Sequence, residues 1–97
     1  MSIGELNIAE VLYPTGQVKY RYSRQLSPDQ SKWIRHGKFI AYHENGTIAS
    51  DGNYENGVEQ GRWRDYHPNG QIASDGCYES GVEVGEWNYW DPDGHRE

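Results

Sequence analysis

The chain has 97 residues, of which 34% are hydrophobic and 25% are charged, and its formal net charge is −6. This size predicts one domain over residues 1–97, and the composition excludes a large apolar core and a membrane-spanning segment. Residues 1–38 hold six basic and three acidic residues, whereas residues 39–97 hold three basic and twelve acidic ones. We therefore expect no nucleic-acid partner, because an acidic surface repels phosphate, and no integral membrane contact.

The first 36 residues are predicted to form a divergent cap and first unit. Glu5–Leu12 alternates in part and predicts a capping strand, and Tyr13–Gly16 predicts a turn. The Ser23–Lys32 segment is rich in serine, glutamine, proline and aspartate, which predicts a longer loop.

From residue 37 onward the sequence repeats with a period of 24 residues. Residues 37–60 and 61–84 are identical at 15 of 24 positions without a gap, and residues 85–97 form a partial third copy. A period of this length predicts an array in which each unit packs on its neighbours. The recurring turn and packing positions are Phe39, Tyr42, Gly46, Gly52, Tyr54, Gly57, Gly61, Trp63, Tyr66, Gly70, Gly76, Tyr78, Gly81, Gly85, Trp87, Trp90 and Gly94.

Each repeat is predicted to be a β-hairpin. The segments 43–46, 67–70 and 91–94 each end in glycine, which favours a type I turn closed by a bulge. A second turn lies around Gly57 or Gly81, again with glycine where a positive φ is expected. No segment has apolar residues at helical spacing, so we expect essentially no helix.

The fold class predicted is an all-β, elongated, single-layer antiparallel meander of about seven short strands. Residues 24 apart would stack as ladders along it: Phe39, Trp63 and Trp87; Tyr42, Tyr66 and Trp90; Tyr54 and Tyr78. Gly52 and Gly76 would leave room for neighbouring aromatic rings to lie flat against the backbone.

The motif Tyr54-x-x-Gly57-x-x-x-Gly61-x-Trp63-x-x-Tyr66-x-x-Asn69-Gly70, repeated from Tyr78 to Gly94, resembles the MORN repeat. More narrowly it resembles the bacterial MORN-repeat variant, whose proteins are commonly assigned to the YwqK-type antitoxin family. This resemblance implies a bacterial, cytoplasmic, non-enzymatic protein that neutralises a cognate toxin by binding it. A cytoplasmic location also suits the single cysteine, Cys77, and an N-terminus without a secretory signal pattern.

Catalytic and metal chemistry are not expected from the residues. His43 and His67 are repeat equivalents beside turns, without the spacing of a metal site. Ser50 and Ser74 are duplicated as well, whereas a nucleophile occupies one special site. We therefore expect no catalytic residue, no metal and no cofactor.

Protein binding is the expected function. The hypothesis places the partner on a recurring acidic ribbon, although the strand pleat could divide it between two faces. The partner would be a basic toxin domain, steered to the ribbon by charge. The alternatives are a scaffold or homo-oligomer formed through open sheet edges, and phospholipid binding through the basic segment Lys19–Lys38. The ribbon consists of Asp51, Glu55, Glu59, Asp75, Glu79 and Glu83.

Overall fold

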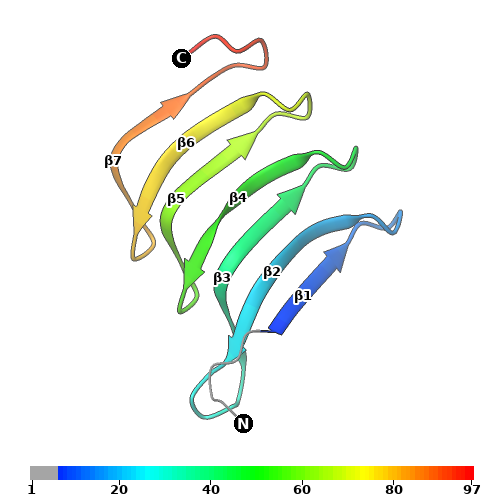
Figure 1. Ribbon diagram of the computed structural model, residues 1–97, viewed down its shortest axis with the longest axis vertical. Helices are drawn as coiled ribbons and strands as arrows, with labels where there is room; N and C mark the ends of the chain where they lie inside the picture. The colour runs from blue at the N-terminus through cyan, green and yellow to red at the C-terminus, as the bar shows by residue number, and fades with distance from the viewer. Residues whose placement is uncertain (1–6) are drawn as a thin grey trace.

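Residues 7–97 of the computed structural model form one sheet of seven strands, ordered as they occur in the chain (Figure 1). Every neighbouring pair is antiparallel, which confirms the predicted meander. No helix occurs within these residues, and none therefore offers the length and apolarity needed to cross a membrane. The strands are β1 (Asn7–Leu12), β2 (Val18–Leu26), β3 (Trp33–Tyr42), β4 (Ile48–Glu55), β5 (Val58–Tyr66), β6 (Ile72–Glu79) and β7 (Val82–Tyr89).

The sheet is a thin, twisted layer of 49 × 37 × 17 Å (Figure 1). Phe39 and Trp63 are its buried hydrophobic residues within the described part of the chain. The predicted capping strand is present as β1, while Glu5 and Leu6 lie outside the described residues. Within residues 7–97 no second layer covers the sheet, so both faces and both rows of turns are open to solvent.

One row of turns lies at the upper right of Figure 1 and consists of residues 13–16, 43–46, 67–70 and 91–94; we call it the bulge-turn rim. In each turn the glycine amide donates to the carbonyl of the first residue, as from Gly46 to His43 at 2.9 Å. The φ of Gly46 is +88°, and the strand register shifts just before the turn. These features confirm the predicted type I turn with a bulge.

The opposite row, which we call the tight-turn rim, consists of residues 27–32, 56–57 and 80–81. Asn56 and Gly57 both have positive φ, +50° and +90°, which defines a two-residue type I′ turn. The sequence predicted this conformation for the glycine only. The amide of Gly57 also donates to the carbonyl of Arg35 at 2.8 Å, so the turn is fixed to the preceding repeat.

The loop expected over Ser23–Lys32 is shorter than predicted. Residues 23–26 continue β2, where Leu26 pairs with Trp33, and only residues 27–32 form a loop. Within it the Asp29 carboxylate accepts hydrogen bonds from the Ser27 hydroxyl at 2.6 Å and the Ser31 amide at 3.0 Å. The prediction was wrong for residues 23–26 because polar composition does not prevent a segment from pairing along a sheet.

The hydrogen bonds to Asp29 predict that the stability of the fold depends on pH in the acid range. Donation from Ser27, and then from Ser31, lowers the pKa of Asp29 from 3.8 to about 2. A carboxyl whose pKa is lower in the folded state stabilises the fold above its unfolded pKa and loses that contribution as the pH falls through its folded pKa. We therefore expect the melting temperature to fall more steeply between pH 4 and pH 2 in the wild type than in Asp29→Asn.

Thermal melts followed by circular dichroism at several pH values would measure this difference. Ser31→Ala removes the Ser31 hydroxyl, which donates to Oδ1 of Asp29 at 2.7 Å, and should give an intermediate slope. Parallel curves for the wild type and Asp29→Asn over that range would contradict the prediction.

One face of the sheet, which we call the aromatic face, carries a continuous row of rings. Phe39 packs on Trp63 with ring centroids 5.6 Å apart, and Tyr54 and Tyr78 contact Trp63 edge-on at 5.2 and 6.1 Å. Two of the three ladders expected from the sequence, Phe39–Trp63–Trp87 and Tyr54–Tyr78, therefore interleave into one row, which runs from Tyr20 to Tyr89. We call the opposite side of the sheet the polar face.

Gly52 and Gly76 clear the space for this row, as predicted. A Cβ atom built on Gly52 would lie 2.1 Å from Cδ2 of Trp63, and one on Gly76 would lie 2.0 Å from Cδ2 of Trp87. The absence of a side chain therefore lets each indole lie directly on the backbone of the preceding strand.

Candidate functional site

The expected acidic ribbon lies partly along the tight-turn rim. Glu55 and Glu79 end β4 and β6, and Glu59 and Glu83 come one residue after the starts of β5 and β7. All four stand within two residues of a type I′ turn. Three of them are exposed, and Glu59 is half-buried.

The pleat divides these glutamates between the two faces. Glu59 lies directly opposite Tyr54, and Glu83 directly opposite Tyr78, so both belong to the aromatic face. Glu55 follows Tyr54 by one residue and therefore points to the polar face, as Glu79 does after Tyr78. The ribbon is consequently two short acidic rows that meet at the rim.

The two aspartates of the expected ribbon are already paired within the protein. Arg62 binds Asp75 at 2.6 Å, and Arg64 lies 3.6 Å from Asp51. The hydrogen bond from Arg62 lowers the pKa of Asp75, and the same contact raises the pKa of Arg62. These arginines were not recognised in the sequence as partners, although alternation along the strand places them on the polar face with Asp75.

The duplicated serines share one carboxylate. Ser50 and Ser74 donate to the two oxygens of Asp65 at 2.5 and 2.8 Å from the strands on either side. Their hydroxyls thus link β4, β5 and β6.

The duplicated histidines link turns along the bulge-turn rim. Nε2 of His43 lies 2.8 Å from the carbonyl oxygen of Tyr66, and Nε2 of His67 lies 2.8 Å from that of Trp90. Because a carbonyl only accepts, each of these nitrogens carries a proton. The hydroxyl of Tyr13 makes the same link to Tyr42 at 2.7 Å.

This arrangement differs from the expected ladder of Tyr42, Tyr66 and Trp90. Within residues 7–97 none of the aromatic pairs joins these three rings to one another. Their backbone carbonyls instead receive the side chain of the preceding turn, and this hydrogen bond stacks the repeats at the rim.

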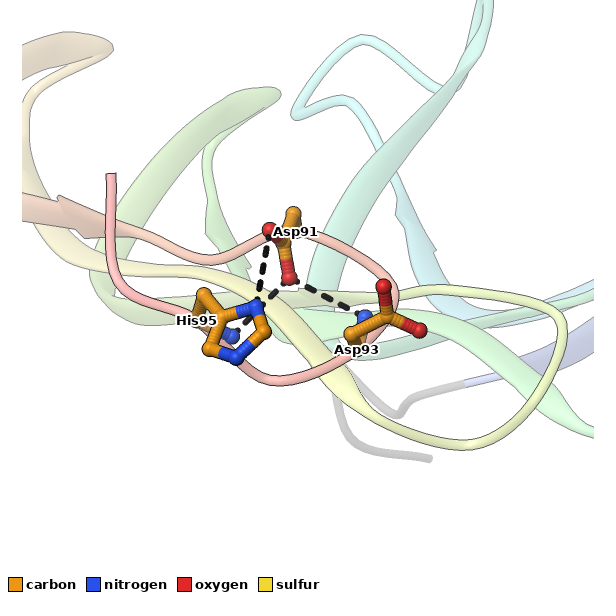
Figure 2. A group of neighbouring side chains, drawn as sticks. All are labelled: Asp91, Asp93 and His95. Atoms are coloured by element: carbon orange, nitrogen blue, oxygen red, sulfur yellow. Dashed lines mark hydrogen bonds and ion pairs between the residues drawn. The ribbon is translucent and has the colours of Figure 1, made fainter.

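The final bulge turn gathers three groups that are able to ligate a metal. Figure 2 shows Asp91, Asp93 and His95, whose donor atoms lie within 4.8 Å of one another. Oδ1 of Asp91 accepts from the backbone amides of Asp93 and His95 at 3.0 and 2.9 Å. These bonds lower the pKa of Asp91 and close the turn, so local turn geometry accounts for the cluster.

A shallow hollow of about 360 Å³ lies beside the first two bulge turns. Its lining includes Gly16, Tyr42 and Gly46, together with Glu10 and Arg21, which form an ion pair at 3.4 Å. None of the site residues expected from acidic patterning lines it.

Residues 35–56 and 59–80 match the family model of the MORN repeat variant. This match, together with the open single-layer repeat sheet described above, supports a binding or scaffold module. Searches of curated proteins and of solved structures gave no match.

Proposed function

We propose that the chain is a non-enzymatic, cytoplasmic antitoxin or immunity protein that binds a basic toxin domain and covers its working surface. The observation that carries the proposal is the set of glutamates at the tight-turn rim. Within residues 7–97 none of the four forms an ion pair, whereas Asp51 and Asp75 do. The four are Glu55, Glu59, Glu79 and Glu83.

Uncompensated carboxylates on one rim attract a cationic partner over a distance of about one Debye length, roughly 8 Å at physiological salt. A toxin that acts on nucleic acid has a cationic groove, because the groove must bind phosphate groups. Binding would then inhibit by occlusion. Exposed aromatic side chains such as Tyr89, which is 45% exposed, supply anchors of the type that dominates protein interfaces.

The test is co-expression with the product of the neighbouring gene. We expect that product to arrest growth alone, the chain to restore growth, and the two purified proteins to form a stable complex. A harmless product, or arrest that the chain does not relieve, would refute the proposal.

Charge variants of the tight-turn rim test the role of its glutamates in binding the same purified partner. A variant with glutamine at positions 55, 59, 79 and 83 should slow association about tenfold or more at low salt. The matched control removes four other exposed acidic charges and should associate at nearly the wild-type rate. Its substitutions are Glu44→Gln, Glu86→Gln, Asp93→Asn and Glu97→Gln.

A scaffold role is the second candidate. Among the described residues β1 and β7 each pair with a single neighbouring strand, and such edges can pair with another chain. The C-terminal residues cover the end of the β7 edge, where the amide of Glu97 donates to the carbonyl of Tyr89 at 2.8 Å. Light scattering at rising concentration would favour this role if the chain formed dimers or longer assemblies, and would count against it if the chain stayed monomeric.

A further inference from the structure

On the aromatic face the guanidinium of Arg35 lies among four rings of this chain. The Cζ atom of Arg35 lies 4.8 Å from the ring centre of Tyr22, 5.4 Å from those of Phe39 and Tyr54, and 5.5 Å from that of Tyr20. Nη1 of Arg35 also donates to the Tyr54 hydroxyl at 3.3 Å. A guanidinium among ring faces is held by cation–π attraction.

In the next two repeats the position equivalent to Arg35 holds a residue of the opposite charge. Arg35 corresponds to Glu59 and Glu83, and the carbonyls of Arg35 and Glu59 accept equivalent turn amides, at 2.8 Å from Gly57 and 2.9 Å from Gly81. Two of the rings around Arg35 recur as well, because Phe39 becomes Trp63 and Tyr54 becomes Tyr78.

The later repeats therefore keep aromatic rings and place carboxylates where the first supplies a cation. Glu83 lies directly across from Tyr78, and Glu59 lies on β5, on the other side of that tyrosine's strand. Burial, and then the charges of Glu83 and Glu59, raise the pKa of Tyr78. Both carboxylates thus act on the same ring, and no basic side chain within residues 7–97 pairs with either.

We propose that Tyr78, Glu59 and Glu83 form a recognition site for arginine side chains of a protein partner, an inference that rests on the basic partner of the proposed function. The partner's guanidinium takes the place that Arg35 fills in the preceding repeat. Arginine fits better than lysine because its planar group stacks on a ring while donating to a carboxylate.

The spacing of the two carboxylates defines a suitable probe. They stand on β5 and β7, two strands apart, which corresponds to about 10 Å. In a polyproline II segment, residues i and i+3 lie on the same side, about 9 Å apart. The probe is therefore acetyl-Arg-Pro-Pro-Arg-amide, compared with acetyl-Gln-Pro-Pro-Gln-amide.

Binding to the full chain is measured by NMR titration, following the signals of the Tyr78 ring and the neighbouring backbone. We expect saturable shifts with the arginine peptide, and no saturation with the glutamine peptide. The double variant Glu59→Gln/Glu83→Gln keeps the Tyr78 ring and should weaken binding about tenfold, the loss expected when two exposed ion pairs are removed.

A matched control lies on the same rim. Glu55→Gln/Glu79→Gln removes the same charge from the polar face and should keep the wild-type affinity. Glu59→Arg should place a guanidinium of this chain in the site and abolish peptide binding while circular dichroism and the melting temperature stay near wild type.

Three results would overturn the inference: equal weakening by both double variants, equal binding of the glutamine peptide, or undiminished binding to a folded Glu59→Arg chain. The proposed function fails separately. A chain that binds the arginine peptide but does not protect cells refutes only the antitoxin role, and a toxin complex unaffected by Glu59→Gln/Glu83→Gln refutes only this site.

Discussion

Gly52→Ala is expected to lower the free energy of unfolding by about 2–3 kcal/mol, because a methyl group would enter the space of the Trp63 ring. The nearest indole atom would be 2.1 Å from the new Cβ, well inside van der Waals contact. Gly52 is not among the glycines with positive φ, so its backbone would accept alanine without strain. The cost therefore comes from displacing the ring.

Denaturant unfolding would measure the loss, which corresponds to a fall of roughly 10–20 °C in melting temperature for a domain of this size. Cys77→Ala, an exposed change on the next repeat, serves as control and should stay within about 0.5 kcal/mol of the wild type. In a Trp63→Leu background the Gly52→Ala change should cost less, because the smaller side chain leaves room for the methyl group. An undiminished cost in that background would show that the ring is not the cause.

The same contact shows what the sequence could predict. A glycine recurring beside an aromatic residue at a fixed period indicates a close approach of ring to backbone, and Gly52 and Gly76 confirm it. The bulge turns were predictable for a similar reason: each needs glycine at one position and tolerates variation at the others. The period itself fixed the strand order, since neighbouring hairpins can bury their rings only against each other.

The pairing of charges could not be predicted in the same way. Whether Asp75 is free for a partner depends on which arginine reaches it, because Arg64 lies directly opposite on β5 and Arg62, opposite Cys77, lies diagonal to it. In the structure Asp75 forms its ion pair with Arg62. Glu79, four residues later, has no ion-pair partner within the described part of the chain. The sequence comparison also did not reveal the rings around Arg35. Comparing repeats highlights the positions that are identical, whereas the position of Arg35 differs from its equivalent, Glu59.

Trp63→Ala should be the most damaging single truncation, lowering the free energy of unfolding by about 3–5 kcal/mol. Trp63 is 8% exposed and contacts three other rings, at 5.6 Å from Phe39, 5.2 Å from Tyr54 and 6.1 Å from Tyr78. Its Nε1 also donates to the carbonyl of Asn53 at 3.0 Å, a partly buried hydrogen bond that alanine cannot make.

The matched control is Trp33→Ala, which removes the same atoms from a side chain that is 45% exposed. The Trp33 ring contacts Arg24, whose Cζ atom lies 4.2 Å from the ring centre, and we expect a loss of about 1 kcal/mol. Comparable losses for the two variants would contradict the inference that the stability of the fold depends on the central row of rings.

Hydrogen exchange would show which strands lose amide protection in Trp63→Ala. In a single-layer array each strand packs chiefly on its two neighbours, so no distant contact replaces a missing ring. Trp63 stands on β5, in the middle of the row, and joins the rings of β3 and β4 to that of β6. We therefore expect protection to fall first in β4, β5 and β6, and to persist longer in β2 and β3, where Arg35 and its rings remain in contact.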